Sequence, residues 1–188
     1  AMMIFRVMNA YGIAALMGFL PLIAERINVT VFQIGFVVSA NLLASSLLQR
    51  YFGMVADKSD KVAMMVAGSI MMLVALALMP LSAGFYTLLF FNILMGLGSA
   101  ISIPAGSAIT AQLGKKLGMG SVMGLFNTAF GIGGGIGPIV AGLIMIATNL
   151  TFVFISSAII VLAGTIVFYY LMKKNVGYKN LGRVVENE

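Results

Sequence analysis

The sequence contains neither cysteine nor histidine. Without cysteine, disulfides, thiolate chemistry and thiol nucleophiles are excluded. Without histidine, a serine–histidine dyad and the H-E-x-x-H zinc site are excluded as well. The G-x-x-x-x-G-K-S/T loop that cradles nucleotide phosphates is also missing. We therefore expect a protein that is not an enzyme and that holds no metal and no cofactor.

Charge is scarce, and acidic charge above all. Charged residues make up 9% of the chain and hydrophobic residues 61%. This balance lies outside the range of soluble domains, because so much apolar surface cannot be buried in a water-soluble core. No Asp or Glu lies inside any long apolar stretch. Arg6 lies within the first stretch, close enough to its end for the side chain to snorkel, and Arg50 lies at the end of the second.

Long apolar stretches dominate what is present. A helix needs about 20 apolar residues to cross a bilayer, and inside lipid it satisfies its backbone hydrogen bonds segment by segment. The sequence predicts an all-α membrane domain over residues 1–172 and a cytoplasmic tail over 173–188. The six expected spans are about 2–24, 31–52, 62–82, 85–113, 121–146 and 150–172.

The basic residues fall almost entirely on one side of this six-span arrangement. Only Arg26 falls on the other side. The positive-inside rule then places both termini in the cytoplasm, with the chain in the cell membrane. An anionic inner leaflet explains the basic balance better than a nucleic acid does. The residues on the basic side are Arg6, Arg50, Lys58, Lys61, Lys115, Lys116, Lys173, Lys174, Lys179 and Arg183.

A short charged run separates the second and third stretches. It reads Gly53-Met54-Val55-Ala56-Asp57-Lys58-Ser59-Asp60-Lys61. Because the run is short, the two flanking helices must return tightly on one face of the membrane. It resembles the G-x-x-x-D-R/K-x-x-R/K loop of the major facilitator superfamily of secondary transporters, which lies between the second and third helices of a six-helix half. The matching residues are Gly53, Asp57, Lys58 and Lys61. The alternative interpretation is an ordinary solvated turn.

Glycine is concentrated in the fifth stretch. Two interleaved G-x-x-x-G pairs predict close packing against other helices. They are Gly131 with Gly135, and Gly133 with Gly137. Pro138 lacks a backbone donor and should kink the helix. Residues 131–142 resemble the G-x-x-x-G-P-x-x-x-G run in the fifth helix of major facilitator halves, prominent among drug–proton antiporters. We expect packing and gating roles for Gly131, Gly135, Gly137, Pro138 and Gly142.

Small and polar residues recur along one face of the fourth stretch. They are Asn92, Gly96, Ser99, Gly106 and Thr110. Such a face indicates either close helix packing or the wall of a water-filled cavity. Neutral polar groups in an apolar wall suit an amphipathic or weakly polar solute rather than a strongly anionic one. The candidate cavity-lining residues of the whole chain are Asn9, Asn41, Asn92, Ser99 and Asn127.

The resemblance implies one six-helix half of a secondary active transporter, built as two inverted three-helix repeats. It implies that the first and fourth helices line a central cavity, the second and fifth face the other half, and the third and sixth support from outside. Asp57 would contact a helix terminus across the interface between halves. The partners would be the other half of the same transporter, a small-molecule substrate and the lipid bilayer.

Two features bear on which half this is and on how it is driven. N-terminal halves usually carry an arginine early in the fourth helix, where this chain has Asn92. The resemblance therefore favours the C-terminal half, helices seven to twelve, and a chain cut from something longer. The resemblance implies transport by alternating access, as efflux or coupled to protons or ions. If transport is coupled to protons, the titrating acid should lie in the other half. The alternatives are a non-transporting six-helix membrane subunit and a half that works as a homodimer.

Overall fold

A computed structural model describes residues 1–174, which form long helices with no strand among them. Six helices are long and apolar enough to cross a membrane, so the predicted all-α membrane fold is confirmed. The C-terminal part of the predicted tail, residues 175–188, lies outside the described residues. In chain order the elements are α1 (Met2–Arg26), α2 (Val31–Lys58), α3 (Lys61–Leu78), the short 3-10 helix η1 (Met79–Leu81), α4 (Phe85–Leu117), α5 (Met119–Ala147) and α6 (Leu150–Lys174).

Two helices run several residues beyond the apolar stretches that predicted them. Helix α2 continues to Lys58 and α4 continues to Leu117. Hydropathy marks the part of a helix that lies in lipid, and polar residues outside the lipid can continue the same backbone hydrogen bonds. The connections are correspondingly short. Only Gly118 joins α4 to α5, at a φ of 95° that glycine adopts without steric cost.

The helix starts follow local capping rules. Thr30 and Gln33 form a capping box, in which the backbone amide of Gln33 donates to the Thr30 hydroxyl oxygen. At the start of α3, the Asp60 carboxylate accepts from the amides of Val62 and Ala63 at 2.9 and 3.3 Å. Caps of this kind contribute about 1 kcal/mol each. They fix where α2 and α3 begin without any help from the rest of the fold.

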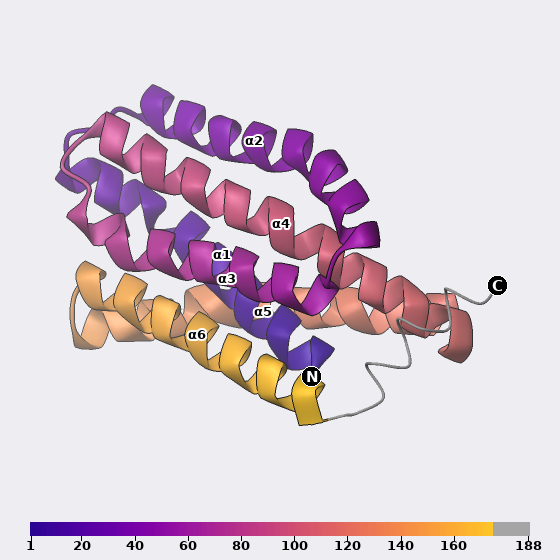
Figure 1. The fold of residues 1–188 in the computed structure, drawn as a ribbon. Coiled ribbons are helices and arrows are strands. Elements are labelled where there is room, and N and C mark those ends of the chain that lie inside the picture. The colour runs from indigo at the N-terminus through magenta and orange to yellow at the C-terminus, as the bar shows by residue number, and fades with distance from the viewer. Residues whose placement is uncertain (175–188) are drawn as a thin grey trace.

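The first three helices and the last three helices make equivalent packing contacts. Helix α1 packs chiefly on α5 and α6, α4 packs chiefly on α2 and α3, and α3 touches α6. Exchanging α1 with α4, α2 with α5 and α3 with α6 leaves this pattern unchanged. Because three is odd, the exchanged helices run in opposite directions, which makes the two units inverted repeats. Figure 1 shows α2 and α4 along one side of the bundle, α5 and α6 along the other, and α1 crossing between them.

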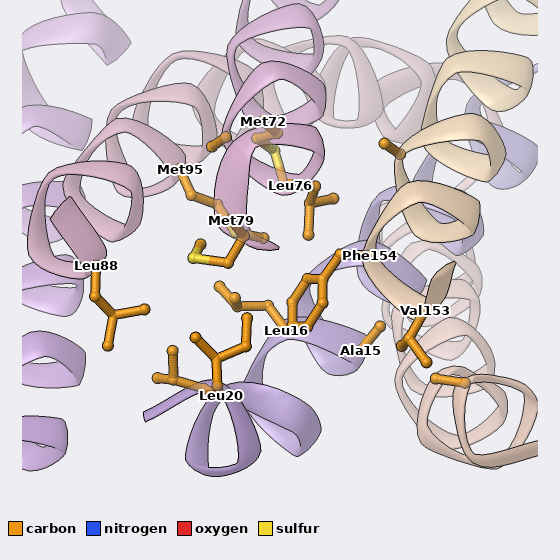
Figure 2. Close-up of a cluster of buried hydrophobic side chains, with 14 of the residues drawn as sticks. Ala15, Leu16, Leu20, Met72, Leu76, Met79, Leu88, Met95, Val153 and Phe154 are labelled. Atoms are coloured by element: carbon orange, nitrogen blue, oxygen red, sulfur yellow. The ribbon is translucent and has the colours of Figure 1, made fainter. Parts of the chain in front are cut away.

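One buried cluster joins the two units. It draws side chains from all six helices and from η1. Figure 2 shows its members Ala15, Leu16, Leu20, Met72, Leu76, Met79, Leu88, Met95, Val153 and Phe154. Lipid tails are as apolar as leucine, so close van der Waals packing rather than removal from water holds such a cluster together. Helices α1 and α4 are thereby fixed in the middle of the bundle, where they position the site described next.

Candidate functional site

The six helices differ sharply in how much of their surface the fold covers. In the most apolar 18 residues of each helix, 56% are buried in α1 and 50% in α4, against 17% in α2 and 22% in α5. The inner helices α1 and α4 are therefore framed by two helices that keep most of their side chains on the outside. A site that opens outward has to lie where an inner helix meets an outer one.

A pocket of about 270 Å³ lies between α1, α2 and α4. This is close to the lower end of ligand pockets, which span roughly 300–1,000 Å³. Its wall combines apolar side chains with uncharged polar ones, and among residues 1–174 no charged residue lines it. The lining residues are Ile13, Met17, Asn41, Leu42, Ser45, Ser46, Gln49, Met95, Ser99 and Ile103. Such a wall can hold a small solute that is partly polar and partly apolar.

A polar stripe on α2 supplies most of the hydrogen-bonding groups. Asn41, Ser45 and Gln49 follow one another at intervals of four, so they share a face of the helix. The Gln49 amide donates to the Ser45 hydroxyl at 3.4 Å, and the Asn41 amide donates to the backbone oxygen of Asn92 at 2.6 Å. Of these three residues, only Asn41 was predicted from the sequence to line a cavity. The spacing of four was the signal that could have identified Ser45 and Gln49.

The small and polar face of α4 serves both of the purposes considered for it. Gly96 gives room for α2, because a Cβ there would lie 2.9 Å from the backbone oxygen of Asn41. Ser99 lines the pocket, while its hydroxyl donates to the backbone oxygen of Gly96 at 2.8 Å. The hydroxyl of Thr110 likewise donates to Gly106 in its own helix. Residues that allow close helix packing and residues that line the pocket therefore alternate along the same face of α4.

Three of the five candidate cavity residues lie outside this pocket. Asn9 is buried and donates to the Ser69 hydroxyl at 3.1 Å, which ties α1 to α3. Asn92 of α4 is fully buried, and its side-chain amide donates to the Leu88 backbone oxygen and the Met79 sulfur. Its backbone oxygen supports the pocket by accepting the hydrogen bond from Asn41. Asn127 is exposed on α5. Only Asn41 and Ser99 are brought together in the pocket wall.

Only one of the two glycine pairs of α5 packs closely within residues 1–174. A Cβ on Gly133 would collide with the backbone oxygen of Val7 in α1, and one on Gly137 would lie 3.1 Å from the Cβ of Ala14. The other pair, Gly131 with Gly135, has nothing within 4 Å, and the same holds for Gly142. Close packing of Gly131 and Gly135 against another helix therefore stays a prediction. The pairs are two residues apart, about 200° around a helix, so only one can face α1.

The charged run between α2 and α3 is mostly helical. Gly53, Asp57 and Lys58 lie in the last turns of α2, and Lys61 is the first residue of α3. Asp57 is exposed and forms no hydrogen bond or ion pair within the part of the chain that the structure describes. An acid in the last turn of a helix faces the negative end of the helix dipole, at a cost of roughly 0.3–1 kcal/mol. No hydrogen bond or ion pair of Asp57 within residues 1–174 offsets that cost.

Comparisons with known proteins add an independent finding. Residues 2–184 match the family model of the Major Facilitator Superfamily. An uncharacterized MFS-type transporter, MJ1560, of Methanocaldococcus jannaschii is 28% identical over 171 residues, which cover 91% of this chain and 44% of that protein. The fosmidomycin resistance protein of Escherichia coli is 30% identical over 125 residues, 66% of this chain and 30% of that protein.

A further relative is the multi-drug resistance efflux pump PmrA of Streptococcus pneumoniae. It is 25% identical over 137 residues, which cover 71% of this chain and 34% of the pump. The chain thus spans less than half the length of each of these relatives.

Proposed function

The chain belongs to the Major Facilitator Superfamily, and from this premise we propose that it is one six-helix half of a secondary active transporter. The half moves a small solute by alternating access together with a second half. As a member of this family with six membrane-spanning helices, the chain is a multi-pass membrane protein of a transporter family rather than an enzyme. The cell membrane is its proposed location.

The observation that carries this proposal is the pocket between α1, α2 and α4. Its uncharged polar wall in apolar surroundings suits an amphipathic or weakly polar solute. Efflux is the proposed direction, because PmrA is named as an efflux pump and the Escherichia coli relative as a resistance protein. No Asp or Glu lies within the membrane-spanning part of the described helices. Coupling to protons would therefore draw its titrating acid from the second half.

The second half packs, in this proposal, against the outward faces of α2 and α5. These two helices bury the smallest share of their apolar residues against the rest of the chain. The open glycines Gly131, Gly135 and Gly142 lie on α5, where small residues let a second backbone approach closely. In this arrangement α1 and α4 line the cavity between the halves, while α3 and α6 support them from outside.

Asp57 acts in this proposal as a latch between the halves. Its carboxylate sits unfavourably near the negative end of α2 and has no partner among residues 1–174. The positive end of a helix in the second half would offset that cost in one state of the transport cycle only. The contact therefore biases the equilibrium between the outward-open and inward-open states.

Neutralising Asp57 tests the latch and, with it, the transport function. In the transporter assembled from both halves, Asp57→Asn is expected to lower the transport rate about tenfold, equivalent to about 1.4 kcal/mol. Uptake or efflux in proteoliposomes measures the rate, and membrane expression should stay at the wild-type level. Glu25→Gln, the same change of charge at the exposed end of α1, is the matched control. A wild-type transport rate for Asp57→Asn would mean that the charged run between α2 and α3 is an ordinary solvated turn.

The orientation in the membrane is tested by single cysteines, which the native chain lacks. We expect Lys115→Cys to be labelled only from the cytoplasm and Ala83→Cys only from outside, because the basic residues collect on the side of Lys115. Both positions are exposed. A membrane-impermeant maleimide on intact cells and on inverted vesicles gives the readout. Labelling of Lys115→Cys on intact cells would contradict this orientation and place Lys115 outside the cell.

A further inference from the structure

Arg6 of α1 is a charged side chain that is partly buried in the helical bundle. It is only partly exposed, and its guanidinium carbon lies 4.6 Å from the ring centre of Phe126 and 4.5 Å from that of Phe130. The two phenylalanines are four residues apart, so they share one face of α5. Contacts of this length are cation–π interactions, in which the rings stabilise the positive charge. Arg6 is therefore held in place rather than free to extend into water.

The rings leave the hydrogen-bonding capacity of the guanidinium unused. Arg6 forms no hydrogen bond and no ion pair with any residue in 1–174, and its buried Nε has no partner. An arginine without a hydrogen-bonding partner in a membrane helix is costly. Glu25 lies at the opposite end of α1, about 28 Å away at 1.5 Å per residue. No acid among residues 1–174 forms an ion pair with Arg6.

The surroundings of Arg6 are closed on one side and open on the other. Phe126 is buried and packs where α1, α4 and α5 meet, since its ring lies 3.6 Å from where a Cβ on Gly106 would be. Phe130 is 40% exposed. A ligand can therefore approach past Phe130, with apolar surface beside the charge.

We propose that Arg6, Phe126 and Phe130 form a binding site for a singly charged oxyanion carried on an apolar body. The N–H groups of a guanidinium lie in its plane and match two oxygens of one carboxylate or phosphodiester. Phe130 also offers apolar contact to the ligand's body. A single arginine, shielded by two aromatic rings, suits a ligand with one negative charge. This narrows the expected ligand from a weakly polar solute to one that carries a single charge. The anion is either a free organic anion or a lipid headgroup, and binding requires neither a second half nor transport.

Binding of benzoate to the chain in phosphatidylcholine nanodiscs tests the proposal. Isotope-labelled arginine gives an Nε–H magnetic resonance signal for Arg6, assigned by its loss in Arg6→Gln. We expect benzoate to shift this signal saturably and neutral benzamide, of the same shape, to leave it in place. Phe130→Leu should weaken benzoate binding about tenfold by removing the ring's contribution. Arg26→Gln, at the exposed far end of α1, should leave it unchanged.

A second arm separates the two sources of the anion. Replacing part of the phosphatidylcholine by phosphatidylglycerol should shift the Arg6 signal without benzoate, and weaken benzoate binding, if a lipid headgroup occupies the site. A benzoate shift that is insensitive to the lipid assigns the site to free anions. The proposal is overturned if neither anion shifts the signal, or if benzamide shifts it as benzoate does. Because no transport is measured, that outcome would leave the proposed transport function untouched.

Discussion

Gly133→Leu is expected to prevent the helices from assembling, whereas Gly135→Leu, two residues away, is expected to leave the assembled chain intact. A Cβ on Gly133 would already collide with the backbone oxygen of Val7, so a leucine must force α5 away from α1. Overpacking of this kind costs 1–3 kcal/mol and more where backbone is struck. Around Gly135 nothing lies within 4 Å, so the same side chain meets open space.

Size-exclusion chromatography and thermal unfolding of the two purified variants give the measurement. Gly133→Leu should lose its monodisperse peak or unfold at a markedly lower temperature, while Gly135→Leu should match the wild type. In the transporter assembled from both halves we expect a different result for Gly135→Leu, because the face of α5 that carries Gly135 is the one proposed to meet the second half. Gly135→Leu should there impair transport with the fold of this half preserved. Equal stability of the two variants would mean that α1 and α5 are not closely packed.

The chain reconstituted alone is expected to give no saturable flux, whereas the chain assembled with a second half transports. The pocket lies beside α2, and only 17% of the most apolar 18 residues of α2 are buried. The outer side of the pocket therefore has no wall beyond α2. Alternating access requires two bodies that rock about a shared site, and one body supplies only one wall. Flux of a candidate solute into proteoliposomes, compared between the lone chain and the co-expressed halves, gives the measurement.

The oligomeric state of the lone chain decides what a positive result would mean. Saturable flux from a monomer would overturn the half-transporter proposal. Flux that rises with dimer formation would favour two copies of this chain in place of two different halves. Gly135→Cys lies on the open face of α5 and would crosslink two copies through that face. Crosslinking that leaves flux intact would support the dimer.

The apolar stretches alone determined the class of this protein and the number of its helices. Membrane thickness sets the length of a span, and every span satisfies its own backbone, so both properties can be read locally. The caps at Thr30 and Asp60 are local for the same reason, since each side chain bonds to amides within three residues. The helix ends at Lys58 and Leu117 escaped prediction because hydropathy reports on lipid rather than on helix geometry.

Only the tertiary structure decided which side each helix turns toward its neighbours. The glycine pattern of α5 is the same for both pairs, yet Gly133 faces α1 and Gly135 faces away. Asn41 and Asn9 are both asparagines in apolar helices, but one lines the pocket and the other bonds to Ser69. Arg6 meets Phe126 and Phe130 across 120 residues of chain. Such choices depend on the rotation and crossing of packed helices, which small residues permit but which no single helix encodes.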